Sequence, residues 1–110
     1  MANDRFVTLL EKTSTKKEIV QILVEFLGTG FPLKWDNDRW FIEVPGIPSC
    51  KHGSLENIYR KDRFIEVIPS QKNRIRNIDV LTRQADLIVS AIADGIAKYI
   101  CLRLQGDLND

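Results

Sequence analysis

The chain has 110 residues and a mass of 12.6 kDa, which is the size of one domain, and residues 1–110 are treated as a single domain. Hydrophobic residues make up 44% and charged residues 28%, a balance that excludes an intrinsically disordered chain. The 16 basic and 15 acidic residues give a formal net charge of +1, so no global field attracts nucleic acid, a membrane or an acidic substrate.

A helix is predicted after Thr15. Thr15 and Glu18 have capping-box spacing, in which the hydroxyl accepts from the amide of the third helical residue and the carboxylate accepts from the capping residue's amide. Apolar residues then recur at the spacing of a helix that faces a core: Ile19, Ile22, Leu23, Phe26 and Leu27. Gly28 stands where helices commonly end, so the sequence predicts a helix over residues 15–27. Residues 4–12 are interpreted as one or two further helical turns.

Two similar segments predict β-strands. Residues 31–35 and 39–44 flank the turn formers at 36–38, which indicates a hairpin. Residues 63–68 form another strand candidate. Like the 39–44 strand, it starts at an Asp-Arg pair, contains Phe-Ile-Glu-Val and is followed by Pro. Because their compositions match, we expect these two strands to be neighbours in a sheet.

The last element is predicted as a long helix over residues 81–104. Polar residues recur at intervals of three or four in this otherwise apolar region: Asp79, Arg83, Asp86, Ser90, Asp94 and Lys98. The tail at 105–110 is expected to fray. This element order predicts an α+β fold, in which a small antiparallel sheet of about three to four strands is packed by an N-terminal helix and a long C-terminal helix. The fourth strand is expected in residues 47–60 or 70–76.

The final helix is apolar over most of its circumference, and a thin sheet covers little of it. We therefore expect a symmetric homodimer, with the alternative that the 15–27 helix and the sheet cover both faces. Trp35 and Trp40 flank the hairpin turn, so one is expected as an exposed anchor for a partner and one in the core. The predicted interface comprises Trp35, Trp40, Ile88, Ile92, Ile96 and Tyr99.

Catalysis has few candidates. Cys50 and His52 lie in the polar connection at 49–62, where an imidazole near a thiol could create a thiolate nucleophile. Glu43 and Glu66 hold matching places in the two similar strands and could form an acid/base pair, although strand glutamates more commonly face solvent. No metal or cofactor is predicted. These observations favour a non-enzymatic protein and leave a small enzyme using Cys50 and His52 as an alternative.

The middle of the chain is basic. Residues 51–76 carry seven basic and three acidic groups, with aromatic residues among them. Basic groups beside aromatic rings can hold single-stranded nucleic acid through phosphate contacts and stacking. The residues predicted for this role are Arg60, Lys61, Arg63, Lys72, Arg74 and Arg76. The alternative is an ordinary solvated loop surface.

Residues 92–100 read Ile-Ala-Asp-Gly-Ile-Ala-Lys-Tyr-Ile. This segment resembles the closing helix of bacterial zinc-dependent N-acetylmuramoyl-L-alanine amidases, and the resemblance implies that Glu66 matches a glutamate on a preceding strand of that family. The family also needs metal-binding histidines and an early Gly-His-Gly segment. Here His52 stands alone and that segment is absent, so neither the amidase activity nor its zinc is transferred.

The leading interpretation is a small protein–protein interaction domain, acting as a regulator, adaptor, inhibitor or assembly subunit. Its partner is expected to be a second copy or another protein, and nucleic-acid binding is the alternative. Charged residues interrupt the apolar stretch at 85–104, so no membrane span is expected. The two cysteines do not form the framework of a secreted scaffold, which favours a reduced, cytoplasmic location.

Overall fold

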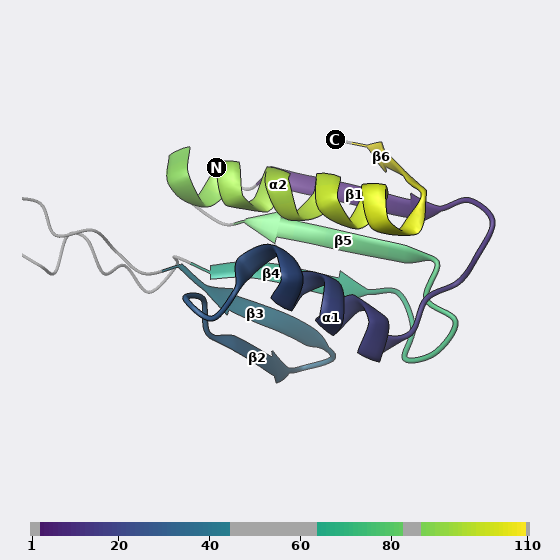
Figure 1. The fold of residues 1–110 in the computed structure, drawn as a ribbon, viewed down its shortest axis with the longest axis horizontal. Helices are drawn as coiled ribbons and strands as arrows, with labels where there is room; N and C mark the ends of the chain where they lie inside the picture. The colour runs from purple at the N-terminus through teal and green to yellow at the C-terminus, as the bar shows by residue number, and fades with distance from the viewer. Residues whose placement is uncertain (1–2, 45–63, 83–86, 110) are drawn as a thin grey trace, which may run out of the picture.

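A computed structural model of the chain describes residues 3–44, 64–82 and 87–109 (Figure 1). Within these residues two helices and six strands form an α+β fold. In chain order the elements are β1 (Asn3–Leu9), α1 (Lys16–Leu27), β2 (Leu33–Asp36), β3 (Arg39–Glu43), β4 (Phe64–Pro69), β5 (Asn77–Thr82), α2 (Leu87–Leu104) and β6 (Gly106–Asn109).

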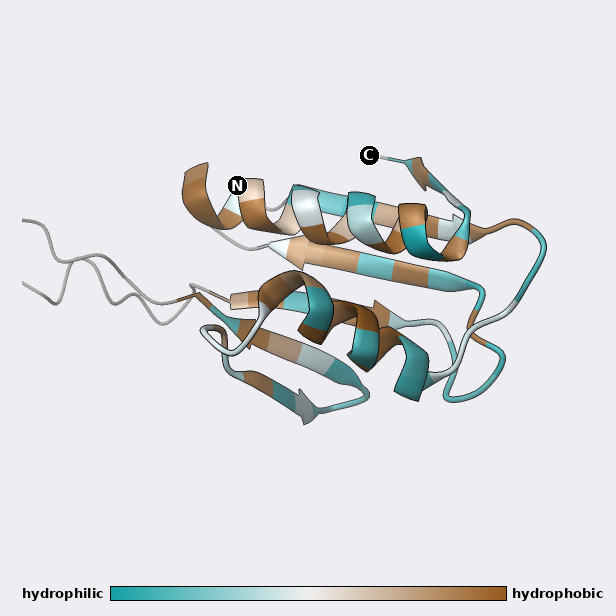
Figure 2. Cartoon of the chain, viewed as in Figure 1, coloured by the Kyte–Doolittle hydropathy of each residue, from teal (hydrophilic) through white to brown (hydrophobic). Residues whose placement is uncertain are grey.

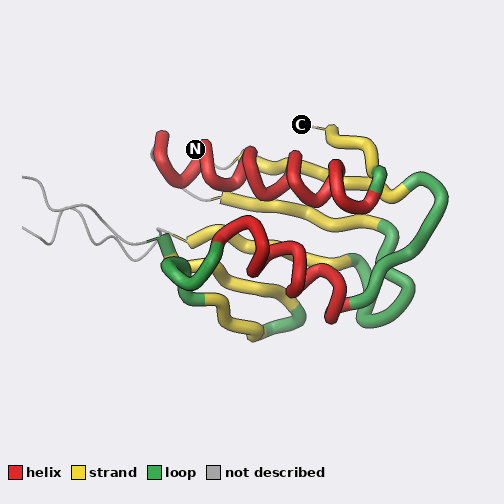
Figure 3. Tube along the Cα trace, in the orientation of Figure 1, coloured by secondary structure: helices red, strands yellow, loops and turns green. Residues whose placement is uncertain are grey.

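The six strands form one antiparallel sheet in the order β2-β3-β4-β5-β1-β6. Both helices lie side by side on the same face of this sheet, α1 over β3 and β4 and α2 along β5 and β1 (Figures 1 and 3). Alternate strand residues point toward the helices, so hydrophobic and hydrophilic residues alternate along β5 (Figure 2). The core therefore lies between the helices and one sheet face.

The predicted α+β class is confirmed, but the sheet has six strands rather than three or four. The helical interpretation of residues 4–12 is wrong because this segment alternates with period two. Val7 and Leu9 are buried toward the helices, while Asp4 and Phe6 point to the opposite face. The tail predicted to fray forms β6, which pairs with β1. The backbone hydrogen bonds to β1, which is distant in the chain, hold this short polar segment in place.

The predicted α1 is confirmed together with its cap. The Glu18 amide donates to the Thr15 hydroxyl at 3.2 Å, as the capping-box spacing predicts. The Glu18 carboxylate accepts from the hydroxyl of Ser14. At the other end Gly28 adopts a φ of 69° and its amide donates to the Val24 carbonyl.

The predicted hairpin is confirmed as β2 and β3. Asn37 and Asp38 have φ values of 52° and 59°, the positive pair that a tight two-residue hairpin turn requires. Trp35 and Trp40 lie opposite each other with ring centroids 4.7 Å apart, and the Lys16 ammonium lies 3.8 Å from the Trp35 ring centre. Trp40 is in the core and Trp35 is half-buried.

The two similar strands are neighbours, as predicted, and they pair antiparallel as β3 and β4. The prediction of a fourth strand in residues 70–76 is wrong, because these residues form the loop between β4 and β5, and its alternative place in residues 47–60 lies outside the described residues. The final helix is predicted to begin at residue 81. Residues 77–82 instead form β5, and α2 begins at Leu87. Asp79, expected on the helical polar stripe, is a strand residue because Ile78 and Val80 beside it are buried in alternation. The 49–62 connection lies outside the described residues.

A buried cation connects α2 to the sheet. Arg5 of β1 is buried on the helix-facing side, where it forms an ion pair with Asp94 and donates to the Ser90 hydroxyl at 3.0 Å and the Ser90 carbonyl at 3.2 Å. A guanidinium is costly to bury unless its N–H groups have acceptors. These contacts therefore position α2 over β1.

The two helices meet at a glycine. A Cβ atom at Gly95 would lie 2.6 Å from the Phe26 ring, so the missing side chain allows α1 to approach α2. The Phe26 and Tyr99 rings have centroids 5.3 Å apart. The Tyr99 hydroxyl donates to Glu25 at 3.1 Å, and Glu25 also pairs with Arg103. Apolar and polar contacts together fix the helix pair.

We expect Asp94→Ala to lower the free energy of unfolding by about 2–3 kcal/mol, because it leaves the buried Arg5 without this carboxylate partner. Arg5→Met should cost less than about 1 kcal/mol, since it removes the buried charge and keeps most of the packing volume. Urea unfolding followed by circular dichroism measures both. Lys98→Ala, exposed on the same helix, is the control. A larger loss for Arg5→Met would contradict this account.

Candidate functional site

The predicted site residues fall into separate parts of the molecule. Those outside the described residues are Cys50, His52, Arg60, Lys61 and Arg63, so the catalytic hypothesis for Cys50 and His52 stays a prediction. Of the predicted interface residues, Ile88 is exposed and Trp35, Ile92 and Tyr99 are half-buried. Trp40 and Ile96 belong to the core and present no surface to a partner, because Trp40 faces the helix layer from β3 and Ile96 faces the sheet from α2. Their assignment to the interface is corrected accordingly.

Basic side chains gather at one end of the sheet. Lys72, Arg74 and Arg76 are exposed in the loop between β4 and β5. A backbone bridge between Ser14 and Ile75 holds this loop against the loop that follows β1. The second loop and the start of α1 add Lys12, Lys16 and Lys17. Sequence reasoning missed the three lysines because the two basic segments are far apart in the chain. We call these six residues the basic end.

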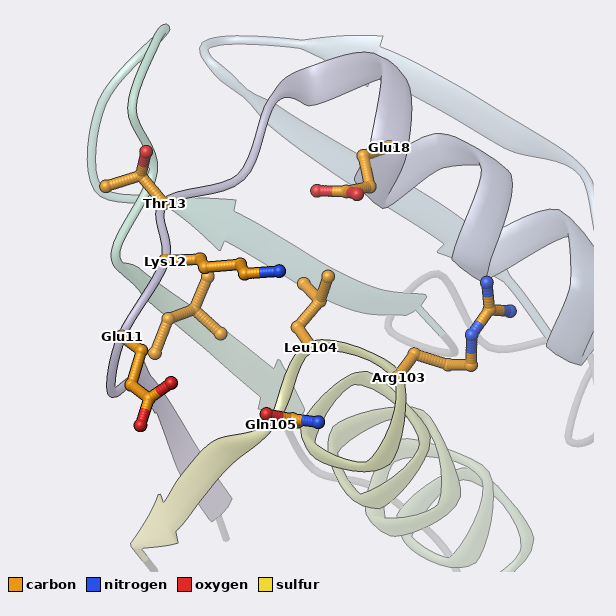
Figure 4. Close-up of a pocket in the computed structure, with 8 residues that line it drawn as sticks. Glu11, Lys12, Thr13, Glu18, Arg103, Leu104 and Gln105 are labelled. Atoms are coloured by element: carbon orange, nitrogen blue, oxygen red, sulfur yellow. The ribbon is translucent and has the colours of Figure 1, made fainter.

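A small hollow lies at the same end, between the β1–α1 loop and the last turn of α2. Lys12 and Glu18 point into it, with Arg103 and Gln105 on the α2 side (Figure 4). Its volume is about 190 Å³, below the range of typical ligand pockets. Glu18 already accepts from Ser14, and Arg103 pairs with Glu25. Two of its charged side chains, Glu18 and Arg103, are therefore already engaged within the fold.

An apolar surface runs along the outside of the helix layer. Leu87 is 89% exposed, Leu102 75%, Ile88 46% and Phe26 40%. The hydrophobic first turn of α2 is visible in Figure 2. The exposed Ala91 lies between Ile88 and Leu102 on α2, and the Phe26 ring packs against Gly95 between the same two residues. We call Phe26, Leu87, Ile88, Ala91 and Leu102 the helical ridge.

The sheet face turned away from the helices is a second apolar surface. The strand register places five large apolar side chains on it: Phe6, Phe41, Phe64, Ile68 and Leu81. Phe6 and Phe64 are exposed and the other three are half-buried. No described helix covers this side (Figures 1 and 3). We call this side the open face.

Glu66 lies in the middle of the open face, and only 8% of its side chain is exposed. It accepts a hydrogen bond from Arg39 at 2.9 Å. Glu43 points to the same face but lies opposite Phe64, while Glu66 lies opposite Phe41. The two glutamates therefore do not face each other, and Glu66 is engaged in an ion pair. This arrangement gives the predicted acid/base pair no geometric support.

The rim of the open face is acidic. Asp4 and Asp107 lie along β1 and β6, and Asp36 and Glu43 lie along β2 and β3. Asp79 of β5 lies inside this rim, between Phe6 and Ile68. Desolvation and the nearby Asp4 carboxylate raise the pKa of Asp79. At the β2 edge a groove of about 500 Å³ is bounded by apolar and charged residues, including Phe41, Phe64, Asp36 and Glu43. Its lining combines hydrophobic walls with two carboxylates and the ammonium of Lys34.

Other chemistry is sparse in the part of the chain that the structure describes. Its His, Cys, Asp and Glu residues form no group of three that could hold a metal ion. Burial and the negative charge of Asp107 raise the pKa of the half-buried Cys101 thiol, which disfavours the reactive thiolate. Neither described helix is long and apolar enough to cross a membrane.

Comparison with known proteins does not add a functional assignment. Protein-family models, curated proteins and solved structures each give no significant match to this chain.

We expect Asp79→Asn to stabilise the fold at pH 7 by less than about 1 kcal/mol, because Asp79 is only partly buried. A carboxyl whose pKa is raised in the folded state costs stability as the pH rises from its ordinary pKa through the raised value. The gain over the unsubstituted chain should disappear near pH 3, where the carboxyl is protonated in both states. Urea unfolding at both pH values measures this, with Asp107→Asn as an exposed control. A gain equally large at pH 3 would exclude the electrostatic explanation.

Proposed function

We propose that this chain is a non-enzymatic protein–protein interaction domain that self-associates through the helical ridge. The observation that carries the proposal is the exposure of Leu87, Ile88 and Leu102 on one side of α2. Isolated exposed leucines are ordinary on protein surfaces, but several exposed apolar residues on one side of a helix are typical of an interface. The ridge spans about 21 Å between Ile88 and Leu102 at the rise of an α-helix.

The ridge is suited to a second copy of itself. Ile88 lies seven residues before Gly95, and Leu102 lies seven residues after it. Seven residues are two turns, so both side chains project on the same side of α2. In a two-fold antiparallel pairing centred at the Phe26 ring that covers Gly95, each Ile88 would face Leu102 of the other copy. A symmetric dimer needs such a self-complementary surface.

The internal alternative is that α1 and the sheet cover α2 on all sides. It holds for part of the surface of this helix. Ile96 and Ile100 face the core, and α1 covers the side that carries Gly95 and Tyr99. Leu87 and Leu102 remain mostly exposed. A second copy would remove these side chains from water, and each fully buried Leu contributes about 1.5–3 kcal/mol.

The test is sedimentation velocity over a range of protein concentrations. We expect reversible growth from the 12.6 kDa monomer to twice that mass. Ile88→Asp combined with Leu102→Asp should return the protein to a monomer at every concentration, because two carboxylates would be buried in the interface. Unchanged circular dichroism would show that this double variant remains folded.

Phe64→Asp is the matched control, since Phe64 has an exposure similar to that of Ile88 but lies on the open face. It should leave the dimer unchanged. A monomer at all concentrations in the unsubstituted chain would exclude self-association, and dissociation by Phe64→Asp alone would move the interface to the open face.

Nucleic-acid binding is the second candidate, and the basic end favours it. Of the aromatic residues expected nearby, Trp40 is in the core, Phe64 lies on the open face at the far end of β4, and Tyr59 lies outside the described residues. Within the described part of the chain, contacts would therefore be to phosphate rather than by stacking. Binding of this kind is weak and strongly salt-dependent.

Fluorescence anisotropy with a labelled single-stranded oligonucleotide tests this candidate. If Lys72, Arg74 and Arg76 each neutralise one phosphate, the logarithm of affinity should fall against the logarithm of salt concentration with a slope of about −2. Reversal of all three residues to Glu should abolish binding, while Lys34→Glu on the open face should leave most of it. No binding at low salt would eliminate the candidate.

A further inference from the structure

We propose that the open face is a second interaction surface and that it binds a segment of a partner protein that is both apolar and basic. This proposal goes beyond self-association and does not depend on the helical ridge, which lies on the other side of the sheet. It rests on three features of the open face: its apolar centre, its acidic rim and the groove at the β2 edge.

The five large apolar side chains of the open face form its apolar centre, and formation of the core does not require them. Core formation needs one face of the sheet, and that face is filled by the residues packed under α1 and α2. The other face of an antiparallel sheet is ordinarily polar when it meets water. Here Phe41 and Phe64 lie close enough for an edge-to-face contact, with centroids 6.4 Å apart, and Phe6 and Leu81 continue the surface on β1 and β5. Aromatic side chains of this kind anchor partners in protein interfaces.

The charge of the open face selects the partner. The register places six carboxylates and two cations on it. Arg39 is paired with Glu66, so Lys34 is the remaining cation among the described residues of this face. The exposed or half-exposed carboxylates are Asp4, Asp36, Glu43, Asp79 and Asp107. A surface of this sign attracts Lys and Arg side chains.

The same charge disfavours other occupants. A second copy placed face to face would bring carboxylates against carboxylates, and like charges in an interface are costly. The phosphates of nucleic acid and of anionic lipids would be repelled for the same reason. The basic end of another copy has suitable charge, but it offers few apolar side chains for the apolar centre.

The groove supplies a specific place for the partner. Its walls include Pro32, Phe41 and Phe64, which suit an apolar side chain. Asp36, Glu43 and Lys34 line the same groove, so the two carboxylates outnumber the one cation and suit a Lys or Arg next to that side chain. The partner segment is therefore expected to place a basic residue beside an apolar one.

The experiment is an NMR titration of the ¹⁵N-labelled full chain with three short peptides. The first contains Lys and Leu in equal numbers, the second has Glu in place of each Lys, and the third has Ser in place of each Leu. We expect the Lys–Leu peptide to bind about tenfold more tightly than either control, with an affinity that falls as salt is added. The shifted amides should map to β3, β4 and β5 around Phe41, Phe64 and Leu81.

Two variants test the surface directly. Phe64→Ser removes an exposed apolar contact, and Glu43→Lys reverses an exposed charge, so each should weaken the Lys–Leu peptide about tenfold. Ile88→Asp on the helical ridge should leave its affinity unchanged, which separates this proposal from self-association. Equal binding of the Glu–Leu peptide, or shifts confined to the ridge or the basic end, would overturn the proposal. Binding of a single-stranded oligonucleotide or of anionic vesicles at the open face would overturn it as well.

Discussion

The structure depends on one constraint: both helices pack on the same face of the sheet. A sheet of six strands has two faces, and α1 and α2 together cover one. The hydrophobic core is therefore a single layer, in which Ile19 and Leu23 of α1 and Ile96 and Ile100 of α2 meet the inward residues of the strands. Two surfaces remain outside this layer, the outer side of the helices and the outer side of the sheet. Each carries apolar residues that the core does not use.

Arg5 shows how firmly this arrangement is specified. Its side chain occupies a place between β1 and α2 where an apolar residue would pack, and its charge is met by Asp94 and Ser90. Because these partners come from consecutive turns of α2, the contact fixes both the rotation of the helix and its position along the strand. That rotation turns Leu87, Ile88 and Leu102 outward. The ion pair and the buried apolar residues of α2 thus together determine which residues form the helical ridge on the outside.

The sequence predicted the elements whose signals are local. The cap at Thr15, the Asn37-Asp38 turn and the repeated strand pattern each operate within a few residues, and each was confirmed. β1 and β6 were missed because β6 pairs only with β1 and β1 pairs only with β5 and β6, all distant in the chain. At Asp79 the spacing of polar residues fitted a helix, although burial of Ile78 and Val80 required a strand. Local periodicity does not distinguish the two when the segments are short.

The surfaces were less predictable than the fold for the same reason. Ile88 was identified because the final helix has an apolar surplus, but the sequence does not show that Ile96 faces inward or that Phe26 joins the ridge across Gly95. The open face depends on the register of five strand pairings, and the basic end depends on a bridge between distant loops. A net charge of +1 likewise conceals an acidic sheet face and a basic end.

If the ridge pairs two copies, their open faces point away from the dimer axis and remain free. Two such faces on one dimer would raise the avidity for a partner with repeated basic segments, without any new contact.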